Sequence, residues 1–193
     1  MMTLLRGMVV VCLGCLLCAQ AQNLEAVQEP ESYIEYYASD DADSWRGRAP
    51  IEELVLHFAE DNLRNVRLEL TIDPAQFNSG NFVRDGNARR SVFQTQRYPR
   101  IHFEASQVSP NVRGFADGDA RELSISGTLD MHGHSRPLQL RMGVRRSGDE
   151  LFASGNFSVL LSDFDMTRPR FFNRQVHDEV RINVVIRARL QPR

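Results

Sequence analysis

Residues 123–144 read LSISGTLDMHGHSRPLQLRMGV, and this stretch decides the fold. Apolar residues alternate with polar ones on both sides of its central His-Gly-His turn: Leu123 and Ile125 precede the turn, and Leu140 and Met142 follow it. A period of two places successive side chains on opposite faces of a strand. We therefore expect an antiparallel hairpin with one face on an apolar interior and the other in water.

The same alternation continues in both directions along the chain. It recurs at residues 54–58, 66–72, 101–103, 157–161 and 180–188. Turn sequences rich in Gly, Pro, Asn and Asp separate these runs. Seven or eight strands of this kind can bury their apolar faces as a sandwich or as a closed barrel, and the period alone does not choose between them. A doubly wound parallel sheet is excluded, because the strands alternate and no long helices connect them.

One internal stretch has the period of a helix. Within residues 85–93, Ala88, Val92 and Phe93 share one helical side, and Asp85 suits the N-cap position. We expect one short helix here, lying across one end of the sheet.

The first 21 residues form a predicted signal peptide. Arg6 precedes an uncharged apolar run, residues 7–18, which is followed by a small-residue cleavage site ending at Ala21. The run is shorter than the ~20 residues that a membrane-spanning helix needs. Cleavage after Ala21 would export the protein to the periplasm or beyond, and lipid anchoring at Cys15 is the alternative.

All three cysteines lie inside this leader, so the mature chain would have no disulfide and would depend on its core for stability. Residues 22–44 form an acidic segment. We expect its early part to be a mobile tether, with a first strand at residues 33–37. The folded domain is expected over residues 45–193, as one unit of ordinary size.

Composition excludes several classes of partner. The net charge is −2, so no basic surface for nucleic acid is indicated. No apolar run outside the leader approaches the length of a membrane span, so we expect a protein that is not integral to the membrane.

Several motifs resemble the YceI-like family. The stretches NSGNFVRD (78–85) and YPRIHF (98–103) resemble its helix entry and the following strand. SGTL and HGHSRPL, within residues 126–138, resemble its next hairpin, and SDF and DEVRI, within 162–182, resemble its last two strands. The resemblance runs in order from residue 45 to residue 190. Two departures are Leu161, where the family often has arginine, and the acidic residues 35–44 in the first strand.

The resemblance implies an all-β fold, a lipocalin-like antiparallel β-barrel of about eight strands with one short helix. It also implies an exported protein that binds an apolar long-chain lipid, a polyisoprenoid or an isoprenoid-tailed quinone, in an elongated pocket. An eight-stranded barrel is about wide enough for one narrow ligand. Each buried methylene contributes ~0.8 kcal/mol, so two or three prenyl units would bind without polar contacts.

The candidate pocket consists of the inward apolar side chains, for which a filled core is the alternative reading. Gly127, Ala153 and Gly155 are small and could leave room inside, and Arg84 is a candidate for contact with a polar head group. For Arg84 the expected role is an ion pair with Asp85 that fixes the helix entry, and the head-group contact is the alternative. The pocket-lining candidates, of which Val92 and Phe93 could close one mouth, are Leu54, Leu56, Phe58, Leu68, Leu70, Val92, Phe93, Ile101, Phe103, Ile125, Leu129, Leu140, Met142, Phe157, Val159, Ile182 and Val184.

No catalytic motif occurs in the mature chain, so we expect a binding protein and not an enzyme. His132 and His134, beside Asp130, are expected to be exposed turn histidines and not metal ligands. We expect no metal and no cofactor other than a bound isoprenoid lipid, and a homodimer is left open. Two other functions remain: an envelope structural or interaction protein with a solid core, and an isomerase or hydrolase, which would need a polar dyad inside.

Overall fold

The computed structural model describes residues 22–193 except 61, 111–114 and 172. The predicted signal peptide lies outside these described residues. The elements, in chain order, are β1 (Asn23–Gln28), β2 (Tyr33–Ser39), β3 (Ser44–Pro50), β4 (Glu53–Ala59), β5 (Asn62–Ile72), η1 (Pro74–Gln76), α1 (Phe82–Asn87), η2 (Ala88–Val92), β6 (Ile101–Ser109), β7 (Ala120–Met131), β8 (His134–Ser147), β9 (Glu150–Leu160), η3 (Leu161–Phe164), β10 (Arg170–Phe171), β11 (Arg174–Gln175) and β12 (Glu179–Pro192).

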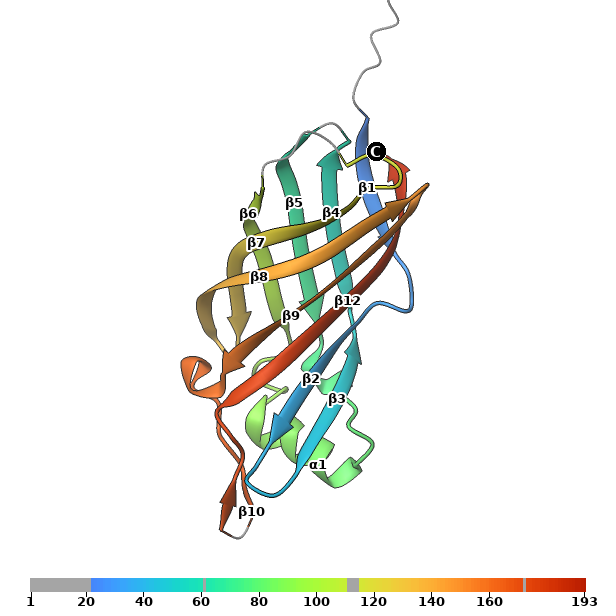
Figure 1. Cartoon of the computed structure of the whole chain (residues 1–193). Helices are drawn as coiled ribbons and strands as arrows, with labels where there is room; N and C mark the ends of the chain where they lie inside the picture. The colour runs from blue at the N-terminus through green and yellow to red at the C-terminus, as the bar shows by residue number, and fades with distance from the viewer. Residues whose placement is uncertain (1–21, 61, 111–114, 172) are drawn as a thin grey trace, which may run out of the picture.

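The strands close into an antiparallel barrel (Figure 1). Neighbours follow the order β1-β4-β5-β6-β7-β8-β9-β12, and β12 pairs again with β1 to complete the ring. The two-residue alternation explains closure, because each strand turns one apolar face inward and a closed ring buries these faces together. β3 extends from this ring: it pairs with β2 on one side and makes only the isolated bridge from Arg48 to Asn78 on the other. The prediction of a lipocalin-like barrel with about eight strands is confirmed.

Two of the eight strand positions are each made of two strands. Along β12, residues 188–192 pair with β1 and residues 181–185 pair with β2, so β1 and β2 together form one interrupted strand. Next to them lie β4, which pairs with β1, and β3, which pairs with β2, but only β4 pairs onward with β5. At the interruption Ser32 keeps contact with β12, because its hydroxyl donates to the Arg187 carbonyl (2.8 Å) and accepts from the Arg187 amide (2.9 Å). The chain therefore runs up and down through eight positions in sequence order.

The acidic N-terminal segment is part of this barrel. The expectation of a mobile tether is wrong for residues 23–28, which form β1, and the predicted strand at 33–37 lies within β2. Glu35 shows how β2 tolerates acidic residues, since its buried carboxylate contacts Arg48 at 3.1 Å and Arg46 at 3.8 Å. Burial alone would raise the pKa of Glu35, but hydrogen bonds from Tyr37 and Arg48 and the two arginine charges hold it below its usual value.

The short helix lies across one end of the barrel, as expected, but it begins earlier (Figure 1). The N-cap is Asn81 and not Asp85: its side chain accepts from the amides of Val83 and Arg84, both at 3.1 Å. α1 continues directly into one π-helical turn, η2. The β10–β11 hairpin projects from the same end of the molecule, so two elements outside the barrel wall gather there (Figure 1).

Candidate ligand cavity

The barrel encloses a cavity of about 440 Å³. Inward side chains from all eight strand positions line it, and these are predominantly apolar. Several of them, including Phe157, Val159 and Ile182, are only half-buried although they line the cavity, so part of their surface is accessible from inside the barrel. The lumen is therefore hollow, and it falls in the size range of small-molecule binding sites.

The structure brings the predicted pocket residues together. All of the pocket-lining candidates border the cavity except Leu54, and Arg84 also borders it. Leu54 is buried in the apolar core, 8 % exposed, without reaching the lumen. Contact of these residues with a ligand stays a prediction.

Several lining residues were missed by the sequence reasoning. Ile34, Tyr36 and Ala38 alternate along β2 and could have been recognised from that alternation, but the surrounding acidic residues masked it. Phe77 and Met166 lie outside the strands, where the two-residue period gives no information. The lining residues that were not predicted also include Asp40, Asp43, Trp45, Asn81, Asn87 and Arg174, which lie near one end.

The inward glycines do not widen the lumen in the expected way. A Cβ atom built on Gly127 would lie 2.2 Å from the Glu104 carbonyl oxygen and 2.7 Å from the Phe103 ring. One built on Gly155 would lie 2.3 Å from the Arg141 carbonyl oxygen and 2.5 Å from the Met142 sulfur. Each glycine is thus covered by a large side chain of a neighbouring strand, as Gly47 is by Tyr36. These glycines let the large side chains lie close to the barrel wall, which is how they affect the space inside.

One end of the lumen is closed by apolar and paired groups. Phe115, which is 2 % exposed, lines this end. Arg146 fastens the Phe115 segment to the barrel: its Nη1 donates to the Phe115 carbonyl and to the Glu60 carboxylate, both at 2.8 Å. The Arg146 side chain is only 12 % exposed, so these charge-assisted contacts are largely shielded from solvent. We call this region the closed end.

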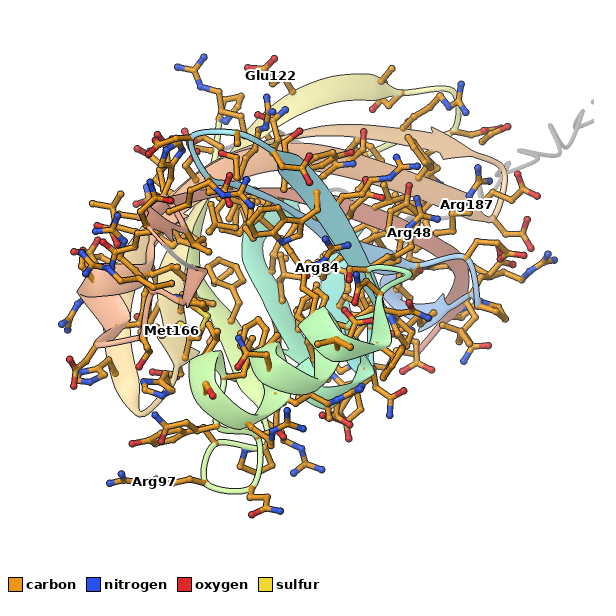
Figure 2. The ribbon with its side chains drawn as sticks, turned by 90° about the horizontal axis from the view of Figure 1, so that it is seen from below. Arg48, Arg84, Arg97, Glu122, Met166 and Arg187 are labelled. Carbon is orange, nitrogen blue, oxygen red and sulfur yellow. The ribbon has the colours of Figure 1, made fainter. Side chains whose placement is uncertain are left out.

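The opposite end, beside α1, is the mouth. The only lining residues that are exposed in the described part of the chain, Asp43, Asn81 and Val83, all lie here. Asp40, Arg84, Asn87 and Arg174 also line this end, so the polar part of the lining is confined to it. Figure 2 views the mouth from below, with Arg84 over the middle of the ring and Arg97 projecting from its edge. An elongated ligand would place its apolar part inside and its polar part here.

At the mouth, Arg84 and Asp85 both bind Ser79 instead of forming the predicted ion pair. Asp85 is buried and accepts from the Ser79 amide (3.1 Å) and hydroxyl. Arg84 donates to the Ser79 hydroxyl (2.9 Å) and carbonyl (3.2 Å), and its guanidinium lies 5.4 Å from the centre of the Trp45 ring. The Ser79 contacts fix the entry of α1 and hold Arg84 at the mouth.

Beneath the helix lies a row of three aromatic rings. Phe77 meets Tyr36 edge-on, with ring centroids 5.2 Å apart, and stacks on Phe93 at 5.5 Å. Burial raises the pKa of Tyr36, so its hydroxyl stays neutral under ordinary conditions. This row joins the helical cap to the barrel wall and supports Phe93 as a lining residue.

Polar contacts join the β2–β3 turn to β11 and to the segment that follows it. Arg174 contacts Asp40 at 3.4 Å, and the His177 ring contacts Asp41 (2.9 Å) and Ser39 (3.1 Å). The row Ser39–His177–Asp41 has the residue types of a hydrolytic triad. However, Ser39 ends β2 and lies between the lining residues Ala38 and Asp40, so its side chain faces away from the lumen. The contacts fasten the rim together and do not form a dyad inside the cavity.

The prediction for His132 is wrong. His132 is buried, only 6 % exposed, and its Nδ1 lies 2.9 Å from the Phe164 carbonyl. Its ring centroid is 4.3 Å from that of Tyr98, so the β7–β8 turn packs against η3 and the loop before β6. Glycine follows at position 133 and allows this fold-back with a φ of +80°. Among the described residues, no group of three or more metal-ligating side chains was found.

Comparisons with solved structures show the same fold. BcnA from Burkholderia cenocepacia is 19 % identical, with a TM-score of 0.70 over 84 % of this chain and 99 % of that protein. A polyisoprenoid binding domain from Saccharophagus degradans, implicated in plant cell wall breakdown, is 16 % identical, with a TM-score of 0.66 over 87 % and 98 %. The YceI protein of Campylobacter jejuni is 21 % identical, with a TM-score of 0.55 over 71 % and 80 %. A search of the curated proteins finds no match.

Within the described residues, no helix is both long enough and apolar enough to cross a bilayer. The model of the YceI-like domain matches residues 27–188, which include all of β2 and most of β12. This match spans far more than half of the sequence and agrees with the barrel just described. The chain belongs to the YceI-like family.

Proposed function

We propose that this protein binds one long apolar lipid, a polyisoprenoid or an isoprenoid-tailed quinone, with the tail inside the barrel. The observation that carries the proposal is a hollow lumen of about 440 Å³ whose polar lining residues gather at one end. Such a cavity matches a molecule with a greasy chain and a small polar head. Each methylene transferred from water would contribute ~0.8 kcal/mol, so the tail would supply most of the affinity.

A neighbouring fold supports the choice of ligand. The Saccharophagus degradans structure is described as a polyisoprenoid binding domain. The alternative of an envelope protein with a solid core fits less well, because the lumen here is open. Binding and not catalysis is the proposed role, since the Ser39–His177–Asp41 row faces away from the cavity.

The cellular location is part of this proposal. Residues 1–21 would direct export, and the mature chain would begin near Gln22, immediately before β1. N-terminal sequencing of the processed protein tests this, because cleavage elsewhere or a lipid on Cys15 gives a different first residue.

The test of ligand binding is a solvent extract of the purified protein, examined by mass spectrometry. Wild-type protein should release a long-chain isoprenoid in stoichiometric amount. Ala153 lines the lumen, so Ala153→Trp should fill it without adding a charge and should abolish the bound lipid. The matched control Ser154→Trp changes the next residue on β9, which points outward, and should retain the lipid.

Circular dichroism separates loss of ligand from loss of fold. A folded Ala153→Trp protein that carries as much lipid as the wild type would contradict the proposal. An empty wild-type protein that also fails to take up a ubiquinone with a decyl tail would contradict it as well.

A further inference from the structure

An exposed apolar pair occupies the first turn of α1. Phe82 is 84 % exposed and Val83 is 60 % exposed, whereas most large apolar side chains of the described chain are buried or half-buried. Val27 and Leu160 are also exposed, but neither of them lines the cavity. Val83 does, so the exposed pair is continuous with the interior of the barrel. An apolar ring held in water at the opening of an apolar cavity indicates a contact surface.

The chain around this pair is basic, although the protein as a whole has a net charge of −2. Residues 81–100 contain five arginines and one acidic residue, Asp85, which is buried against Ser79. Arg90 and Arg97 are exposed, and no ion pair to a carboxylate is found for either within the described residues. Arg97 projects from the edge of the mouth in Figure 2. The cap therefore presents cations beside its apolar pair.

Three acidic residues at the same end, Asp40, Asp41 and Asp43, lie on the β2–β3 turn. Asp40 accepts from two backbone amides, at 2.9 and 3.0 Å, and contacts Arg174. Asp41 contacts His177 at 2.9 Å. Asp43 is exposed and accepts from the Ser44 amide at 2.8 Å. These carboxylates therefore lie on the side of the mouth formed by the β2–β3 turn. The α1 side keeps its positive charge.

From this combination we propose that the mouth docks on an anionic phospholipid bilayer. Phe82 and Val83 would enter the interfacial region, and Arg90 and Arg97 would meet lipid phosphates. The choice of an anionic bilayer over a protein rests on charge complementarity and on the continuity between the exposed pair and the cavity. The purpose of docking rests on the proposed function: a water-insoluble tail could pass between bilayer and lumen without crossing water.

Vesicle binding tests the proposal directly. The protein would begin at residue 22, because the apolar leader would bind lipid by itself and every barrel strand lies after it. Flotation with vesicles of equal phosphatidylglycerol and phosphatidylethanolamine should recover the protein, and phosphatidylcholine vesicles should recover much less. Phe82→Ser should weaken binding to the anionic vesicles about tenfold. Arg90→Gln with Arg97→Gln should weaken it roughly twentyfold.

Matched controls change the same residue types elsewhere. Val27→Ser removes an exposed apolar side chain from β1, and Arg141→Gln with Arg187→Gln removes two exposed arginines from the barrel wall. Both controls should bind within about twofold of the wild type. Equal losses of vesicle binding in these controls and in the Phe82 and arginine variants would overturn the proposal. Wild-type protein that binds neither kind of vesicle would also overturn it and would leave a protein partner as the occupant of this surface.

The lipid extract separates this proposal from the proposed function. Protein that carries an isoprenoid but does not bind anionic vesicles would overturn docking alone. Protein that binds vesicles through Phe82 and the two arginines, yet never carries or takes up a lipid, would overturn ligand binding alone.

Discussion

The two ends of the lumen differ in how they are built. At the closed end, Phe115 is 2 % exposed, and the nearby Arg146 makes largely shielded contacts with Glu60 and with a backbone carbonyl. At the mouth, the lining includes carboxylates, amides and guanidinium groups that reach water. The difference separates two tasks. The closed end contributes stability and a dry surface, whereas the mouth can change its contacts at little cost to the fold.

The largest expected effect is at the closed end. Phe115→Ala should lower the free energy of unfolding by about 3–5 kcal/mol, because it removes a fully buried ring. Phe82→Ala at the mouth should change it by less than about 0.5 kcal/mol, since that ring is 84 % exposed. Urea unfolding monitored by fluorescence measures both. Similar losses in the two variants would remove the distinction between the ends.

An intermediate loss of stability is expected for Asp85, the buried carboxylate beside the mouth. Asp85→Ala leaves the Ser79 amide and hydroxyl without their acceptor, and it should cost about 1–3 kcal/mol. Hydrogen exchange should show the loss first in α1, whose entry these contacts hold. If hydrogen exchange became faster in β7 and β8 by as much as in α1, the contacts of Asp85 would not be specific to the mouth.

The smallest expected change in stability is at Asp40, on the rim of the mouth, and it depends on pH. The Ala42 amide lowers the pKa of Asp40, burial opposes this, and the Asp43 amide with the charges of Arg174 and His177 lowers it further. A depressed folded pKa adds stability that is fully present above the unfolded value, about 3.9, and is lost as pH falls through the folded value. Asp40→Asn should therefore be less stable than the wild type at pH 7.

Thermal unfolding of both proteins at pH 7 and at pH 2 checks this sign. The gap should be small at pH 7, because Arg174 is partly exposed, and it should narrow at the lower pH. A gap that widens on acidification would mean that Asp40 does not act through its ionised form.

The barrel could be predicted from sequence because each strand carries its own evidence. The alternation in residues 123–144 became β7 and β8, and the same pattern identified β4, β5, β6, β9 and β12. β1 was missed because its pairing with β12 joins residues far apart in sequence, and its acidic neighbours suggested a tether. The predicted N-cap was displaced by four residues, since Asn81 and Asp85 are both good caps and only the contact with Ser79 distinguishes them.

The candidate site was predicted in part for the same reason. Inward residues such as Leu140 and Ile182 follow from the strand period, and they line the cavity. The polar rim could not be predicted from the strand period, because a turn, a helix and a hairpin with no common sequence pattern bring Asp40, Asn87 and Arg174 together. His132 was misjudged because its burial depends on Tyr98 and Phe164, which sequence proximity does not indicate.

The pairing of β12 with both β1 and β2 has a consequence for folding. β12 joins β9 to the two strands at the start of the chain, with Leu24 opposite Pro192, so the ring cannot close until the last residues are available. Contacts over such a separation form slowly. Until then, the edges of β9 and β1 stay open and can pair with the same edges of another copy. Shortening the C-terminus by a few residues should therefore favour strand-exchanged oligomers over unfolded monomer, and a chaperone that shields β1 during synthesis should suppress them.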